Sequence, residues 1–180
     1  MKPSHFHHAL GGTNQTGGIE QNPQELSMLV NFMGENHIKT FLEIGCAGGF
    51  LQRYMLGIGI KASGITLDKR DTHEGLAITY GRSQDKDIIN FVKEQVKENG
   101  KFDMIFVDGD HSYEAVKADY ENYKDCCHYM AFHDLEGKRN CEGVEKLWVE
   151  LSFSHGKHRG NVEFHADNKE QSSGIGIIEI

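Results

Sequence analysis

The chain has 180 residues, of which 38% are hydrophobic and 26% charged, a balance typical of one globular domain rather than of a disordered chain. Its 27 acidic residues outnumber 19 lysines and arginines, and the net charge of −8 disfavours nucleic acid, whose phosphates bind basic surfaces. A small neutral or cationic substrate fits this charge better.

No apolar run approaches the roughly 20 residues that span a bilayer, and the N-terminus lacks the apolar core of a signal peptide. The four cysteines show no metal-ligand spacing and are most simply reduced thiols. They are Cys46, Cys126, Cys127 and Cys141. We therefore expect a cytoplasmic protein without a membrane partner, and both a monomer and a homo-oligomer are compatible with the sequence.

Residues 1–22 are polar and rich in glycine, and they include His5, His7 and His8. They are predicted to form a flexible arm or a lid, and residues 23–180 the folded domain. Pro23 opens a helix, because proline is tolerated in the first turn, and Asn36 is a plausible stop. One apolar face of this helix comprises Leu26, Leu29, Val30 and Met33.

Residues 40–50 predict a buried strand that runs through a glycine turn into a helix. Glycines at such a junction let a ligand approach the bare backbone. Glu43, two residues before the first glycine, would repel the pyrophosphate of a dinucleotide but suits a cofactor with an ammonium group. A tight turn without a ligand is the alternative. The glycines of the turn are Gly45, Gly48 and Gly49.

Strands and helices alternate along the rest of the chain, which predicts an α/β fold with a mostly parallel sheet. Helices are expected over residues 50–56, 88–96, 113–123 and 144–151. Strands are expected over residues 61–67, 77–81, 102–107, 127–132, 162–164 and 175–180.

Polar residues follow the carboxyl ends of these strands, where open α/β sheets bind their ligands. Asp68 is the candidate to bind ribose hydroxyls, with a helix N-cap as its alternative role. Ser83 and Gln84 are candidates to contact adenine, although Ser83 would also serve as an N-cap. The strands at 102–107 and 127–132 are followed by Asp108, Asp110, His111, His133 and Asp134.

Four stretches of the sequence are specific enough to compare with a known protein family. They are the run from Phe102 to Asp119, Ala-Phe-His-Asp, Gly-Val-Glu-Lys-Leu-Trp and the C-terminal Gly-Ile-Gly-Ile-Ile. Together with the glycine loop, they resemble class I S-adenosylmethionine-dependent methyltransferases. Within that class they resemble the small group related to macrolide-sugar O-methyltransferases and cephalosporin-hydroxylase-like proteins. This resemblance covers about residues 38–180. It implies a Rossmann-like seven-stranded sheet with helices on both faces and the last strand antiparallel.

The resemblance also implies transfer of a methyl group from S-adenosylmethionine to an oxygen of a small molecule, such as a sugar or a catechol. Relatives hold a divalent metal at the positions of Asp108, His133 and Asp134, and His111 matches their general base. Asp108 and Asp134 offer the oxygen ligands that Mg²⁺ prefers, so Mg²⁺ is the predicted ion. His133 departs from the carboxylate of relatives and suits Zn, Fe or Ni better, which leaves the ion open.

Other roles for these residues remain open at this point. Asp108 and Asp134 would also serve in capping or loop hydrogen bonds, and His111 in a bond to Asp110. A metal-dependent hydrolase built on the acids and histidines would not need Glu43 or the glycine loop. A protein that binds S-adenosylmethionine without catalysis is the third function compatible with the sequence.

Overall fold

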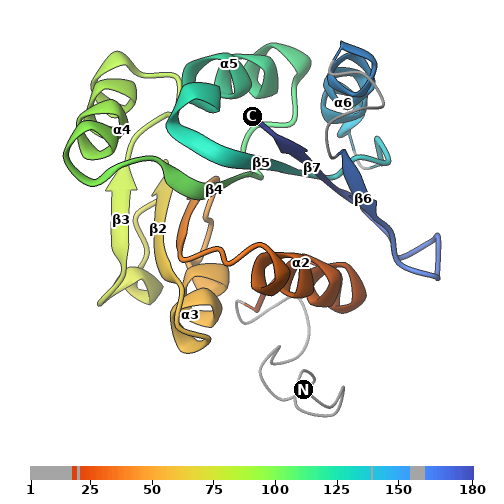
Figure 1. Ribbon diagram of the computed structural model, residues 1–180, viewed down its shortest axis with the longest axis horizontal. Helices are drawn as coiled ribbons and strands as arrows, with labels where there is room; N and C mark the ends of the chain where they lie inside the picture. The colour runs from red at the N-terminus through yellow and green to blue at the C-terminus, as the bar shows by residue number, and fades with distance from the viewer. Residues whose placement is uncertain (1–17, 20, 139, 155–160) are drawn as a thin grey trace.

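Seven strands form one sheet in the computed structural model, which describes residues 18–19, 21–138, 140–154 and 161–180. Their order across the sheet is β3-β2-β1-β4-β5-β7-β6, as Figure 1 shows from β3 on one side to β6 on the other. The strands are β1 (Thr40–Ile44), β2 (Lys61–Thr66), β3 (Ala77–Tyr80), β4 (Phe102–Val107), β5 (Cys127–His133), β6 (Val162–Phe164) and β7 (Ile175–Glu179).

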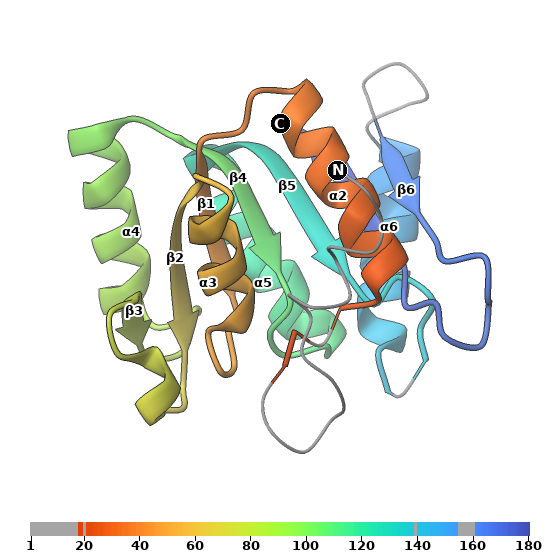
Figure 2. The same cartoon turned by 90° about the horizontal axis from the view of Figure 1, so that it is seen from below.

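β1 to β5 pair in parallel, whereas β7 runs antiparallel to both of its neighbours, β5 and β6. Strand order reverses between β1 and β4, which are neighbours in the sheet but not in the sequence. Figure 2 shows β4 and β5 pointing toward the same edge of the sheet. The predicted fold, a mostly parallel sheet of seven strands with the last one antiparallel, is confirmed.

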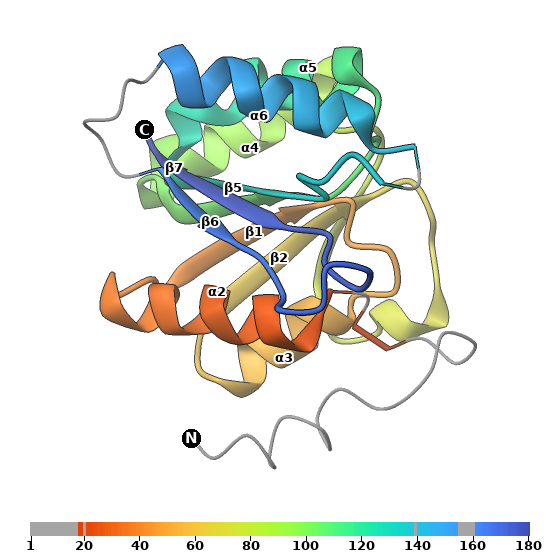
Figure 3. The same ribbon diagram turned by 90° about the vertical axis from the view of Figure 1, so that its right-hand side faces the viewer.

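Helices cover both faces of the sheet (Figure 3). One face carries α2 (Pro23–Glu35) and α3 (Phe50–Gly57). The other carries α4 (Lys86–Asn99), α5 (Tyr113–Tyr123) and α6 (Glu142–Ser154). Each face has its own apolar core, because both surfaces of a parallel sheet must be covered. The 3₁₀ turns η2 (Asp71–His73) and η3 (Lys124–Cys126) lie in the connections.

The helix predicted to open at Pro23 and to stop at Asn36 is confirmed as α2, and both of its ends follow local chemistry. The side chain of Asn22 accepts hydrogen bonds from the backbone N–H groups of Gln24 and Glu25, and Pro23 takes the first helical position. Asn36 is the C-cap. The predicted strand ends differ from the observed ones by at most one residue, as at β5, which extends to His133. α4 and α6 each begin two residues earlier and end three residues later than their apolar stripes predict.

The predicted arm lies largely outside the described residues, and so do His5, His7 and His8. The prediction of an arm or lid over residues 1–22 therefore stays a prediction. Of the arm, Gly18, Ile19, Gln21 and Asn22 are described, and the first three line the pocket discussed below. Within the described ranges, none of the helices is both long and apolar enough to cross a lipid bilayer.

Candidate active site

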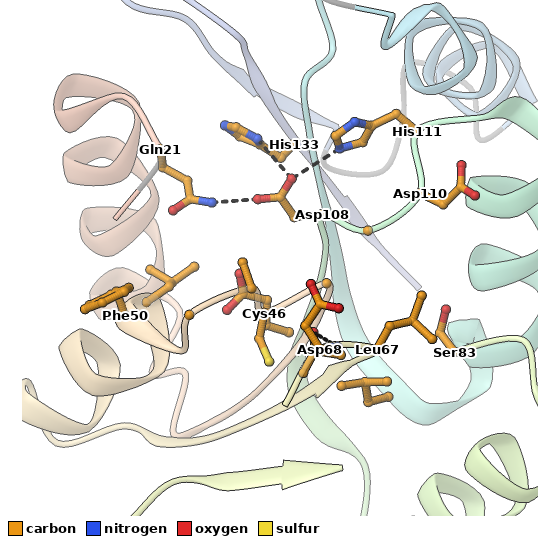
Figure 4. Close-up of a pocket in the computed structure, with 18 of the residues that line it drawn as sticks. Gln21, Cys46, Phe50, Leu67, Asp68, Ser83, Asp108, Asp110, His111 and His133 are labelled. Atoms are coloured by element: carbon orange, nitrogen blue, oxygen red, sulfur yellow. Dashed lines mark hydrogen bonds and ion pairs between the residues drawn. The ribbon is translucent and has the colours of Figure 1, made fainter. Parts of the chain in front are cut away.

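A pocket of about 610 Å³ lies at the carboxyl ends of the parallel strands, around the point where strand order reverses. This volume is in the range of small-molecule and cofactor sites. Figure 4 shows its side chains coming from the ends of β1, β2, β3, β4 and β5. Every predicted site residue except Gly49 lines the pocket. These residues are Glu43, Gly45, Gly48, Asp68, Ser83, Gln84, Asp108, His111, His133 and Asp134.

The glycine loop lets β1 and β4 approach each other closely at the pocket floor. A Cβ atom on Gly45 would lie 2.1 Å from the backbone oxygen of Asp108. The φ of Gly45 is +91°, which residues with a side chain rarely adopt. Gly49 has a φ of +74° and precedes α3 as its N-cap. The loop therefore presents bare backbone to the pocket, as a cofactor loop requires.

Glu43 is buried beneath this loop with 3% exposure and accepts a hydrogen bond from Gln52 of α3. Phe50 packs over Gly48 at the pocket's edge, on the side of the close-up opposite Ser83 (Figure 4). The aromatic ring leaves the pocket open. Burial and the charge of Glu43 raise the pKa of the Cys46 thiol to about 12, which makes this loop cysteine a poor nucleophile.

Asp68 is exposed at the end of β2 and pairs with Arg70, with 3.4 Å between Arg70 Nη2 and Asp68 Oδ2. It does not cap a helix, because η2 begins only after Arg70. Asp68 thus keeps its carboxylate at the pocket, where the ribose role was predicted. The N–H of Asp68 donates a hydrogen bond of 3.3 Å to the Thr66 hydroxyl, which holds the backbone at the end of β2.

Ser83 and Gln84 lie at the end of β3 and are held by a buried carboxylate of α5. Gln84 Nε2 donates to Asp119 Oδ1 at 2.7 Å. Burial raises the pKa of Asp119 to about 6, against the lowering effect of hydrogen bonds from Ser83 and Gln84. Asp85, not Ser83, is the N-cap residue of α4, so the alternative role of Ser83 is not observed.

Asp108 is the centre of the polar contacts at the other end of the pocket. Its Oδ1 lies 3.3 Å from His133 Nδ1 and 3.4 Å from His111 Nε2. Its Oδ2 accepts a hydrogen bond of 2.6 Å from Gln21 Nε2 (Figure 4). The alternative bond between His111 and Asp110 is not observed, since Asp110 instead accepts from the Ser112 N–H.

The charges of this cluster shift each other's protonation. Burial alone would raise the pKa of Asp108 and of Asp134, but the neighbouring His133 lowers both below their ordinary values. Burial alone would lower the pKa of His133, but Asp108 and Asp134 raise it well above its ordinary value. The hydrogen bond with Asp108 is the main cause of the raised pKa of His111.

Asp108, His133 and Asp134 fit a divalent cation. One donor atom from each residue lies within 4.8 Å of the others, and His133 Nδ1 is 3.3 Å from Asp134 Oδ2. His133 Nε2 is buried and has no hydrogen-bond partner in the described part of the chain. Asp134 has a φ of +64°, an uncommon conformation for a residue with a side chain and one often found at functional sites.

Two polar residues that line the pocket, Gln21 and Cys141, were not predicted to belong to the site, and neither was His73, which contacts the glycine loop. Gln21 and Asp108 are 87 positions apart in the sequence, and His73 of η2 belongs to a turn too short to leave a periodic pattern. Cys141 was excluded as a ligand by its spacing, but it lies 3.3 Å from His111 Nδ1. Burial, then the charge of Asp134, raise the pKa of Cys141 to about 11.

Comparison with solved structures supports the fold. An O-methyltransferase from Bacillus cereus in complex with SAH has a TM-score of 0.61 at 13% identity, over 100% of this chain and 92% of that chain. The O-methyltransferase TomG from Streptomyces achromogenes, in complex with SAM, has a TM-score of 0.62 at 14% identity, over 99% and 88%.

MycE, a methyltransferase of mycinamycin biosynthesis in complex with Mg, SAH and mycinamycin VI, has a TM-score of 0.62 at 16% identity. The alignment covers 85% of this chain, which spans only about half (48%) of the length of MycE. At these identities the three likenesses establish the fold alone.

No curated protein sequence matches the chain. A family model described as a methyltransferase domain matches residues 42–134, slightly more than half of the chain. The matched segment begins in β1 and ends at Asp134, so it contains the glycine loop and the acid-histidine cluster. The family predicted from these features is confirmed, and the chain belongs to the methyltransferase domain family.

Proposed function

We propose that this protein is an S-adenosylmethionine-dependent O-methyltransferase that acts on a small hydroxylated molecule, such as a sugar or a catechol, with the help of a divalent cation. The observation that carries the proposal is a single pocket with two chemically different ends. One end is the glycine loop with Glu43 and Asp68, and the other is the cluster of Asp108, His111, His133 and Asp134.

The loop end is suited to the cofactor. Glu43 and the backbone of Gly45 would bind its methionine part, the carboxylate of Asp68 its ribose, and Ser83 with Gln84 its adenine. S-Adenosylmethionine supplies a methyl group that is already electrophilic, so the chain's main tasks are to align the acceptor and to remove its proton.

The cluster end is suited to the acceptor. Asp108, His133 and Asp134 would hold the cation, which lowers the pKa of a hydroxyl when bound. Mg²⁺ is present in the MycE complex and is the ion predicted for this chain. His111 would take the acceptor's proton at Nε2, in the tautomer whose Nδ1–H donates to Cys141 Sγ.

The rival hydrolase function has less support. A hydrolase centred on the acids and histidines gives no role to a buried Glu43 or to a loop whose close approach to β4 requires glycine. In a methyltransferase, both features border the cofactor.

A transfer assay with S-adenosylmethionine labelled in its methyl group, run against a panel of sugars and catechols, tests this proposal. We expect label in at least one acceptor, and a loss of about 10²-fold or more in His111→Ala, because a positioned base contributes about 10²–10⁴-fold. His128→Ala is the matched control, since His128 is exposed at the opposite end of β5. Hydrolysis of an ester or phosphate without label transfer would contradict the proposal.

A further inference from the structure

A second group of potential metal ligands overlaps the first. His111, Asp134 and Cys141 also place one donor atom each within 4.8 Å of one another. The group shares Asp134 with the first one but offers a thiol in place of a second carboxylate. Its members come from the loop after β4, the end of β5 and the residue before α6.

The contact between His111 and Cys141 has the dimensions of a metal site. His111 Nδ1 lies 3.3 Å from Cys141 Sγ. Two such donors on one tetrahedral zinc ion lie about 3.5 Å apart, given Zn–N near 2.0 Å and Zn–S near 2.3 Å. An ion would therefore need only small movements of these two side chains.

The backbone fixes this contact. A Cβ atom on Gly143 would lie 2.2 Å from the Tyr113 nitrogen and 2.4 Å from the His111 oxygen. This close approach brings the start of α6 against the His111 loop. Cys141 is held there as well, because its carbonyl accepts the Val144 N–H at 3.0 Å. The thiol is thus part of the packed scaffold and is only 3% exposed.

We propose that His111, Asp134 and Cys141 form a second metal site, selective for a thiophilic divalent ion such as Zn²⁺, whose occupancy inhibits methyl transfer. Binding displaces the thiol proton to solvent and leaves a thiolate ligand, which selects transition metals over Mg²⁺. Three protein ligands leave a fourth position for water.

The inhibition follows from the nitrogen that the ion occupies, and this part rests on the proposed function. An ion on Nδ1 leaves the ring's proton on Nε2, so Nε2 no longer accepts the acceptor's proton. The ion also takes Asp134 from the group that would hold the catalytic cation. Zn²⁺ and Mg²⁺ therefore compete through a shared carboxylate.

Cobalt titration of the metal-depleted protein tests the site without an activity assay, because thiolate-bound Co²⁺ has a charge-transfer absorption band. We expect this band in the wild type, its loss on Zn²⁺ addition, and at most a partial loss with excess Mg²⁺, which competes for Asp134 alone. Cys141→Ser should abolish the band and weaken Co²⁺ binding about tenfold or more, since even outer partners of metal ligands contribute about 10–100-fold. Cys126→Ser, which removes a buried thiol before β5, should change neither.

The wild-type spectrum decides the outcome even if the cysteine variant does not fold, and His111→Gln provides a second variant that should weaken Co²⁺ binding. No band in the wild type, or a band that persists in Cys141→Ser, would overturn the site. Micromolar Zn²⁺ should inhibit the wild type, and Cys141→Ser should be less sensitive relative to its own rate; equal sensitivity would overturn the inhibition. A cobalt–thiolate band in a protein that transfers no methyl group would support the site and refute the proposed function.

Discussion

Asp108 connects the chemistry of the site at the level of single residues. It contacts His111, His133 and Gln21, and its position after β4 places it against the glycine loop. Its negative charge raises the pKa values of His111 and His133 and so favours their protonated forms. A cation that binds here must displace protons, which couples metal affinity to pH.

Mg²⁺ affinity should therefore rise with pH. His133 binds a cation only in its neutral form, and its pKa is raised well above 6.5, so protons compete across the neutral range. Calorimetry should show an increase of up to about tenfold per pH unit as the pH rises above about 6.5, as expected when one proton is displaced.

His133→Asp is the matched variant for this prediction. It replaces the imidazole by a carboxylate that is already ionised at pH 6, so most of the pH dependence should disappear. Mg²⁺ affinity that is independent of pH in the wild type would mean that His133 is not a ligand.

At the level of elements, η2 supports the glycine loop from behind. His73 is buried, and its Nε2 lies 2.6 Å from the Ala47 carbonyl oxygen, while its Nδ1 lies 3.2 Å from the Tyr80 hydroxyl. Arg53 of α3 donates to the carbonyl of Thr72 within this turn and to that of Glu74, its C-cap. Ala47 has a φ of +40°, so the loop conformation needs such support.

His73→Ala should weaken cofactor binding without changing the chemical step. The lost hydrogen bond is worth about 1 kcal/mol, so we expect the KM for S-adenosylmethionine to rise about fivefold while kcat stays close to wild type. Tyr80→Phe, which removes only the outer hydroxyl, should have a smaller effect. Steady-state kinetics at varied cofactor concentration would check both, and an unchanged KM in His73→Ala would rule out this supporting role.

Glu25 connects α2 to the segment between β6 and β7. Its Oε1 accepts from the Ser172 hydroxyl at 2.7 Å and from the N–H groups of Ala166, Ser173 and Gly174 at 3.0–3.2 Å. The residue is fully buried, so its removal leaves several buried donors without an acceptor. Ser173 also lines the pocket, so this connection shapes the site.

We expect Glu25→Ala to lower the free energy of unfolding by about 3 kcal/mol, because unsatisfied buried groups cost about 1–3 kcal/mol each and the loop relaxes in part. Glu35→Ala, at the exposed end of the same helix, should stay within about 0.5 kcal/mol of wild type. Urea denaturation would measure both. Equal losses of unfolding free energy in the two variants would show that the buried contacts of Glu25 do not stabilise the fold.

At the level of the whole molecule, the alternation of strands and helices was enough to predict the sheet and its parallel core. The strand ends at Glu43, Asp68, Asp108 and Asp134 were predicted to converge, because carboxyl ends of parallel strands meet at one edge. All four line the pocket. Local patterns and a general rule of topology account for this success.

Long-range contacts were beyond the reach of those patterns. Gln21 approaches Asp108 only because α2 lies against the sheet, and Cys141 approaches His111 only because Gly143 lets α6 pack against the preceding loop. The buried contacts of Glu25 likewise depend on β6 and β7 folding back toward α2. Each contact joins residues at least 30 positions apart, and periodicity carries no information at that distance.

A crystal structure of the protein with S-adenosylhomocysteine would test the central claim most directly. The proposed function predicts a ligand whose amino-acid end lies at Glu43 and Gly45, whose ribose lies at Asp68, and whose sulfur faces His111 and Asp108. A pocket that stays empty at saturating ligand, or a ligand bound away from the glycine loop, would contradict it.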